Sequence, residues 1–166
     1  MSAVIVRAAA LTPESFAPFG DVIEIAGHAA RPINQGTCLR YDDLAPIDVA
    51  ADGGRPLISI FEAAPRPLPL AVRVLERHPL ARQAFFPLDA RPFLVVVAAH
   101  GSQPLVHRIR AYLSSGAQGV NYRRGTWHHP LIALGETSRF LVVDRGGPGE
   151  NCDEIAVDEA VFVEVD

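Results

Sequence analysis

The sequence contains no lysine, and all fifteen of its Lys or Arg residues are arginines. Schiff-base chemistry and a phosphate-binding P-loop both need lysine and are therefore excluded. A cationic side chain that binds an anionic substrate would have to be arginine, whose planar fork suits a carboxylate. The net charge is −4 and no basic cluster occurs, so no nucleic-acid partner is expected.

Cysteines and long apolar runs are also scarce. Only two cysteines occur, Cys38 and Cys152, and they are expected to be free thiols, with a metal or nucleophile role as the alternative. The longest apolar run, Phe93 to Ala99, is far shorter than the roughly 20 residues that cross a bilayer, and the N-terminus has no signal-peptide pattern. We expect a cytoplasmic protein without a membrane partner, folded as one domain over residues 1–166.

Fourteen prolines and thirteen glycines divide the chain into short segments that favour β-structure. A short helix is predicted from the capping Thr12 and Pro13 to about Phe19, with Gly20 ending it. Residues 145–150 are expected to form a surface loop. Nine strands are predicted, which suggests a barrel or jelly roll. They are Leu57–Glu62, Leu70–His78, Gln83–Phe86, Phe93–Ala99, Ile109–Leu113, Gly119–Tyr122, Leu131–Ala133, Phe140–Asp144 and Glu154–Val163.

The strand that ends at His78 has an unusual pattern. Side chains alternate between the two faces of a strand, so Val72, Val74, Glu76 and His78 are expected to share one face. The valines indicate that this face is the interior. Burying Glu76 and His78 there is costly unless they are paired, hydrogen-bonded or bound to metal, which indicates a functional site. Alternatively, the strand twists near Leu75 and both groups face solvent.

Two spacings match the cupin motifs. Glu76, His78 and Gln83 follow the first motif, His-x-His-x4-Glu, with Glu for the first His and Gln for the final Glu. Gly125 and His128 have the Gly-x-x-His spacing of the second motif. The two motifs predict an all-β fold, a cupin-type jelly-roll barrel with one short N-terminal helix, in which all four polar residues face one cavity.

The predicted cluster allows two kinds of chemistry. Glu76, His78, Gln83 and His128 could hold a divalent metal such as Ni²⁺, Mn²⁺ or Zn²⁺, although an amide is a weaker ligand than a carboxylate. They could equally form a metal-free acid–base site, because imidazoles titrate near neutral pH. No organic cofactor is expected.

Several segments make the chain resemble the ureidoglycolate lyase family of allantoin catabolism, once called ureidoglycolate hydrolases. The resemblance covers nearly the whole chain, and Ala81, Arg82 and Arg123 are its modest departures. It implies a cupin barrel, usually a homodimer, that cleaves (S)-ureidoglycolate to urea and glyoxylate. The segments are Asn34–Thr37, Glu76–Leu80, Gln83–Leu88, Gly119–Tyr122, Gly125–Leu131, Phe140–Arg145 and Asn151–Glu154.

Cleavage of such a substrate needs a base for the hydroxyl, an acid for the departing nitrogen and a cation for the carboxylate. His78 or His128 is the predicted base, and Glu76 would orient an imidazole or relay protons. The remaining assignments concern substrate contacts. Gln83 and Asn121 would contact the urea end, and Tyr122 and Trp127 would wall the site or pack in the core. Asn34 is also expected to contact the substrate, and Arg40, in the neighbouring segment, would bind the carboxylate or form a surface ion pair. His129 is expected to pack rather than catalyse.

Three other functions fit the same residues. An amidohydrolase acting on ureidoglycolate would release ammonia and carbon dioxide. A non-catalytic cupin would bind a small carboxylate. A different metal cupin would act as a sugar isomerase or dioxygenase, against which the neutral Gln83 speaks.

Overall fold

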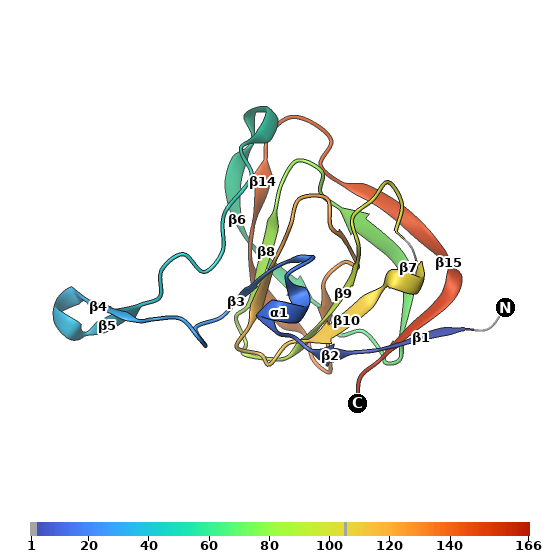
Figure 1. Cartoon of the computed structure of the whole chain (residues 1–166), viewed down its shortest axis with the longest axis horizontal. Helices are drawn as coiled ribbons and strands as arrows, with labels where there is room; N and C mark the ends of the chain where they lie inside the picture. Colours follow the sequence, from blue (N-terminus) through green and yellow to red (C-terminus); the bar gives the residue numbers. More distant parts are fainter. Residues whose placement is uncertain (1–2, 105) are drawn as a thin grey trace.

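A computed structural model describes residues 3–104 and 106–166, which form two facing β-sheets in a nearly closed barrel (Figure 1). The larger sheet has the strand order β1-β15-β7-β12-β9-β10-β2, with β13 also paired to β9. Its strands are β1 (Val4–Arg7), β2 (Ala9–Ala10), β7 (Leu70–Arg77), β9 (Phe93–Ala98), β10 (Arg110–Leu113), β12 (Trp127–His128), β13 (Ile132–Ala133) and β15 (Asp153–Glu164).

The smaller sheet has the order β3-β11-β8-β14-β6 and closes the other side of the barrel. Its strands are β3 (Gly20–Ile23), β6 (Arg55–Ala63), β8 (Gln83–Pro87), β11 (Gly119–Tyr122) and β14 (Ser138–Gly146). Three short 3-10 helices connect strands: η1 (Asn34–Gly36), η2 (Ala51–Gly53) and η3 (Val106–Arg108).

The barrel interior is filled by side chains from both sheets. Phe93, Val95 and Val97 of β9 meet Phe85 of β8 and Phe140 of β14 in one buried cluster. The alternate residues of β9 are buried as well, because they pack in a second cluster on the outer side of the larger sheet. Strand β9 is therefore buried on both faces, which explains its unbroken apolar sequence.

The short N-terminal helix, α1 (Pro13–Phe16), closes one end of the barrel. The Thr12 side chain accepts a hydrogen bond from the Ser15 amide at 3.2 Å, as its capping position predicts. The helix ends at Phe16, three residues earlier than expected, and the next strand, β3, begins at Gly20. A β-carbon at Gly20 would lie 2.1 Å from the Asn121 carbonyl oxygen, so the close strand contact requires glycine.

A hairpin of β4 (Arg31–Ile33) and β5 (Cys38–Arg40) projects well away from the barrel (Figure 1). We call residues 24–50, which carry this hairpin, the arm. Leu39 and Ile47 of the arm are 57% and 65% exposed. The arm returns along the outer face of the smaller sheet, where its residues 43–49 line a cavity with Ala84 and Val143.

The all-β, cupin-like barrel with one short N-terminal helix is confirmed, and the nine predicted strands match β6 to β11 and β13 to β15. The predicted surface loop over residues 145–150 is confirmed for residues 147–150, which are exposed and outside any strand, but its first two residues are wrong. Strand β14 continues to Gly146, and Arg145 is buried with its guanidinium donating hydrogen bonds to the carbonyls of Ala51 and Pro148. Among the described residues, no helix is long and apolar enough to span a membrane.

Candidate active site

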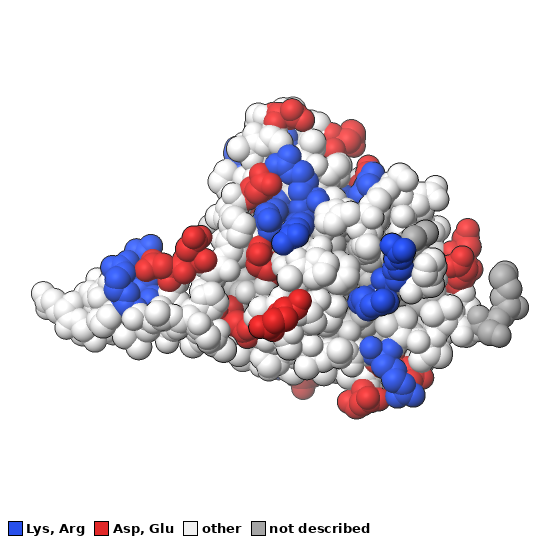
Figure 2. Space-filling view, in the orientation of Figure 1, with Lys and Arg blue, Asp and Glu red and all other residues white. Residues whose placement is uncertain are grey.

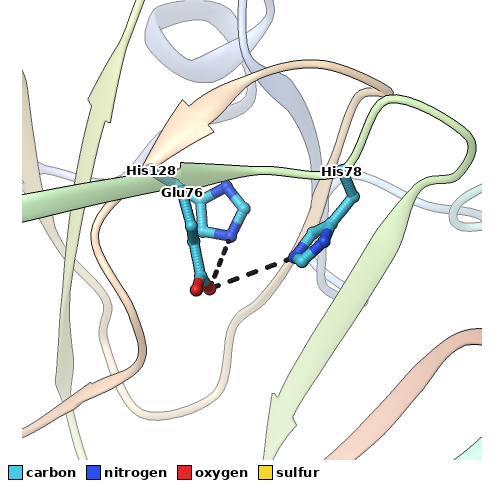
Figure 3. Close-up of side chains that lie close together, drawn as sticks. All are labelled: Glu76, His78 and His128. Atoms are coloured by element: carbon cyan, nitrogen blue, oxygen red, sulfur yellow. Dashed lines mark ion pairs between the residues drawn. The ribbon is translucent and has the colours of Figure 1, made fainter. Parts of the chain in front are cut away.

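Two neighbouring strands of the larger sheet bring Glu76, His78 and His128 together. His128 of β12 lies directly opposite Glu76 of β7 and opposite Val97 of β9. Directly paired residues share a sheet face, and Val97 belongs to the interior cluster. Glu76 and His128 therefore both point into the barrel, and His78, just beyond the end of β7, turns toward them (Figure 3).

The three side chains converge on one carboxylate oxygen. Glu76 Oε1 lies 3.3 Å from His128 Nε2 and 3.9 Å from His78 Nε2. The amide oxygen of Gln83 lies 3.0 Å from His78 Nε2. The structure thus brings together all four residues that the cupin spacing selects.

Backbone carbonyl groups hold both imidazoles by their other nitrogen. His128 Nδ1 lies 2.9 Å from the Thr126 oxygen, and His78 Nδ1 lies 2.7 Å from the Asn151 oxygen. A carbonyl accepts but does not donate a hydrogen bond, so each Nδ1 carries a proton. In the neutral imidazoles, each Nε2 therefore presents its lone pair toward the centre of the cluster. The Gln83 oxygen that faces His78 Nε2 is an acceptor too, so this contact needs a proton or a cation between the two atoms.

Such an arrangement fits a metal ion. Ligating histidines commonly donate their second ring N–H to a carbonyl or carboxylate. One ligand atom from each of Glu76, His78 and His128 lies within 4.8 Å of the others. Among the described residues, the buried Nε2 of His128 makes no hydrogen bond of good geometry, although Glu76 Oε1 lies 3.3 Å away, as expected of a nitrogen placed to bind a cation. The Gln83 oxygen offers a fourth, weaker donor.

The cluster keeps Glu76 ionised. Burial alone would raise the pKa of Glu76, but the contact with His128 and the positive charges available on His128, His78 and His129 outweigh it. The pKa of Glu76 is therefore held below its ordinary value. At neutral pH the carboxylate is therefore a stable negative group between the two imidazoles.

Tyr122 forms one wall of the cluster. Its ring stacks on that of His128 at 4.1 Å, with 10° between the planes. Burial, and secondarily the charge of Glu76, raises the pKa of Tyr122, so the phenol stays neutral. Stacking fixes the plane of His128, which has little freedom to leave the cluster.

Two cavities meet the cluster from different sides. The first, of about 410 Å³, is lined by Glu76 and Gln83 together with Phe61, Glu62, Ala63, Phe85, Pro130 and Leu131. None of these described lining residues is an arginine. The second, of about 360 Å³, is lined by His78 and Gln83 and includes Arg82, Asp144 and Arg145. His78 and Gln83 separate the two spaces.

Several predicted substrate contacts lie elsewhere. Asn121 precedes Tyr122 on β11 and faces the outside of the smaller sheet, where its amide donates to Asp21 and to the Pro46 carbonyl. Arg40 and Asn34 lie on the arm. Arg40 forms an ion pair with Asp42, and acidic and basic side chains lie side by side on the arm in Figure 2. The structure does not bring these three residues to the cluster.

Neighbours of His128 in the sequence also point away from the cluster. Trp127 is paired with Ala98 and packs in the second core cluster, with the Arg77 guanidinium 4.7 Å from its ring centre. His129 is buried, its amide donates to the Val96 carbonyl and its Nδ1 faces the Pro130 oxygen. These contacts fit the packing role expected of His129.

Glu76 points into the barrel, but it does not share a strand face with Val72 as the sequence predicted. Val72 packs in the second core cluster together with Leu75. Residues three apart share a face only if the alternation is interrupted, and the pairing of β7 with β15 shifts register between Ala156 and Val161. Because of this irregularity, Glu76 lies on the face opposite to Leu75 and not on that of Val72.

Sequence reasoning did not assign roles to three residues that hold the cluster. The carbonyls of Thr126 and Asn151 anchor the imidazoles, and Asp144 contacts the Gln83 amide. Backbone acceptors have no residue signature. All three residues do occur in segments that carry the family resemblance, and this was the available signal.

Both cysteines are free, as predicted, and both are exposed. The negative charge of the cluster acts on the thiol of Cys152. Burial, together with the negative charges of Glu76, Glu154 and Asp153, raises the pKa of Cys152. Because the thiolate is the nucleophile, iodoacetamide should alkylate Cys152 with a half-maximal rate at a pH above the ordinary thiol value. The Cys38→Ser variant isolates this reaction. Adding Glu154→Gln should lower that pH, and an unchanged or higher midpoint would contradict the charge effect.

A small β-barrel with two imidazoles, a carboxylate and an amide converging in its interior defines a cupin with an acid–base or metal-binding centre. The ureidoglycolate lyase family model matches residues 3–164. The chain belongs to the ureidoglycolate lyase family.

Individual relatives agree with this assignment. A ureidoglycolate lyase of Burkholderia mallei is 57% identical over 153 residues, covering 92% of this chain and 89% of the relative. One of Burkholderia cepacia is 52% identical over 160 residues, covering 96% and 90%. One of Pseudomonas aeruginosa is 54% identical over 144 residues, covering 87% and 85%. The similarity therefore extends over nearly the full length of each chain.

Proposed function

We propose that this protein is a ureidoglycolate lyase that cleaves (S)-ureidoglycolate to urea and glyoxylate, with residues 1–166 acting as one catalytic domain. The observation that carries the proposal is the convergence of Glu76, His78 and His128 inside the barrel of a chain 52–57% identical to ureidoglycolate lyases. A packing role alone would not favour burying a carboxylate between two imidazoles.

The reaction moves one proton from oxygen to nitrogen. A base removes the hydroxyl proton, the carbon–oxygen bond becomes a carbonyl, the carbon–nitrogen bond breaks, and the ureido nitrogen takes up a proton to leave as urea. His78 lines a cavity, whereas the side chain of His128 is only 2% exposed. We therefore assign the shuttling of the proton to His78 Nε2.

Glu76 and His128 support this transfer. Glu76 stays ionised because its pKa is lowered, so it stabilises the imidazolium that forms when His78 accepts the proton. His128 holds the carboxylate of Glu76 from the opposite side at 3.3 Å. Gln83, whose side chain lies between the cavities, can contact the urea end of the substrate. The general acid–base contribution is typically about 10²–10⁴-fold.

The substrate carboxylate needs a positive partner. Arg82 lines the second cavity but is engaged in an ion pair with Asp21 at 2.7 Å. As the alternative to metal-free proton transfer by His78, we propose that Glu76, His78, His128 and the Gln83 oxygen hold a divalent cation, with Ni²⁺, Mn²⁺ and Zn²⁺ as candidates. His78 Nε2 would then bind the cation and would not carry the proton. When bound, the cation supplies charge for the substrate carboxylate and lowers the pKa of the hydroxyl. Elemental analysis of protein purified without chelator or nickel affinity resin tests this assignment.

A product assay tests the proposed reaction. Purified protein incubated with ureidoglycolate should form urea and glyoxylate in equal amounts, with no ammonia. Ammonia without urea would instead establish the amidohydrolase, and binding without either product would establish the non-catalytic alternative.

We also propose that the protein forms a homodimer through the outer face of the smaller sheet. Ile58 and Ile60 of the edge strand β6 are 77% and 55% exposed on this face, and the arm with its exposed Leu39 extends from the same side. A two-fold contact between identical copies would cover the sheet face and the arm of both at once. A second copy is therefore the partner that matches both surfaces.

A charged residue introduced on this face of the sheet should dissociate the dimer. Ile60→Arg is expected to weaken self-association at least tenfold, because the charge would lose its hydration in the contact. Light scattering during size-exclusion chromatography measures the mass. The matched control is Ile5→Arg, at a 50% exposed position on the larger sheet, which should leave the dimer intact. A dimer that survives Ile60→Arg would remove this face as the interface.

A further inference from the structure

The amide of Gln83 has a defined direction although its two ends are alike in shape. Its oxygen lies 3.0 Å from His78 Nε2, and its nitrogen donates to Asp144 Oδ2 at 3.4 Å. Rotating the amide by half a turn would place the NH2 group in the cluster instead. Whether the cluster receives an acceptor or a donor thus depends on what fixes this rotation.

Asp144 can fix it because a carboxylate accepts hydrogen bonds and does not donate them when ionised. Asp144 follows Val143, which pairs with Ala84 of β8, so the two side chains lie next to each other on the interior side of β8 and β14. Gln83 is 7% exposed and also has Tyr122 opposite it on β11. The amide is largely shielded from bulk solvent, and Asp144 is the acceptor that its nitrogen faces.

Burying Asp144 at this position is unfavourable for folding, which supports a functional reason for its presence. Its second carboxylate oxygen, Oδ1, is buried and has no hydrogen-bond partner in the described residues. An unsatisfied buried carboxylate oxygen is unfavourable for folding. Packing alone would favour an apolar or fully hydrogen-bonded residue at this position.

We propose that Asp144 is a positioning residue that turns the oxygen of Gln83 toward the cluster. The cluster then presents four electron-pair donors to one point: two imidazole nitrogens, the Glu76 carboxylate and the Gln83 carbonyl. This inference rests on the proposed function, because it concerns how the same centre binds its substrate or cation. Asp144 itself stays behind Gln83 and contacts Gln83 instead of the reacting atoms.

Asp144→Asn tests the proposal, because an amide at position 144 can accept or donate and no longer fixes the direction of Gln83. We expect kcat/KM for ureidoglycolate to fall about 10–100-fold, as is typical for residues that orient ligands. The affinity of the metal-stripped protein for Ni²⁺, measured by calorimetry, should fall by a similar factor. The matched control Asp158→Asn makes the same change at an exposed position on β15 and should change neither value.

Combining Asp144→Asn with a second substitution distinguishes an orienting role of Asp144 from a structural one. In Gln83→Glu, two carboxylates face each other and repel, so adding Asp144→Asn should raise kcat/KM there, whereas it lowers kcat/KM in the wild type. A merely structural Asp144 would lower activity in both backgrounds. Equal effects in both, or no effect of Asp144→Asn on either turnover or Ni²⁺ affinity, would overturn the proposal. Wild-type protein without turnover would overturn the proposed function, while the Ni²⁺ measurement still tests the role of Asp144.

Discussion

Alanine at position 128 is expected to lower kcat/KM for ureidoglycolate by at least about 10–100-fold, because His128 positions Glu76 and is a proposed ligand of the cation. His128 is the closest partner of Glu76, at 3.3 Å, and its side chain is almost fully buried. Without it, the carboxylate keeps only His78 at 3.9 Å and loses the group that fixes its position. Glyoxylate formation measures the effect.

The pH profile gives this prediction a second readout. The contact with His128 helps to hold the pKa of Glu76 below its ordinary value, so the pKa of Glu76 should rise in His128→Ala. Glu76 would then become protonated at higher pH, and the acidic limb of the residual activity should move to higher pH. A limb at the wild-type position would show that Glu76 ionisation does not depend on His128.

The control for this variant is His28→Ala, which removes an exposed imidazole from a turn and should leave kcat/KM unchanged. Circular dichroism should show the same β-sheet content in both variants. A His128→Ala protein that keeps its fold and loses less than threefold in kcat/KM would exclude His128 from the catalytic centre.

The cluster could be predicted from sequence because its members occur at short, fixed spacings. Glu76 lies near the end of β7, His78 lies just beyond it, and Gln83 begins β8, so the short connection between the two sheets keeps the three residues close together. His128 required only that β12 pair with β7. These local patterns also placed the nine strands that became the walls of the barrel.

The parts that could not be predicted depend on contacts between distant segments. The shift between Ala156 and Val161 changes which residues of β7 face inward, and nothing within β7 indicates it. Asn121 and Tyr122 were both expected at the site, but alternation along β11 turns the two to opposite faces of the smaller sheet. Arg40 is separated from the cluster because the arm leaves the barrel, which its hydrophobic pattern does not indicate.

Stability should depend most on the core between the two sheets, and Phe140→Ala is expected to cost about 3–5 kcal/mol of unfolding free energy. Phe140 is fully buried on β14, and its ring meets that of Phe93 edge to face at 5.1 Å. For a chain of this size, the melting temperature should fall by roughly 6–20 °C. Thermal unfolding followed by circular dichroism measures the shift.

Ile5→Ala is the control for this prediction, since Ile5 is 50% exposed and surface truncations usually change stability by less than about 0.5 kcal/mol. A shift of less than about 2 °C in Phe140→Ala would mean that this core relaxes into the space left by the ring. Phe140 pairs with Pro87, at the far end of the strand that begins with Gln83. Well below its melting temperature, the variant should therefore keep nearly wild-type kcat, because the loss affects the walls of the barrel and leaves the cluster in place.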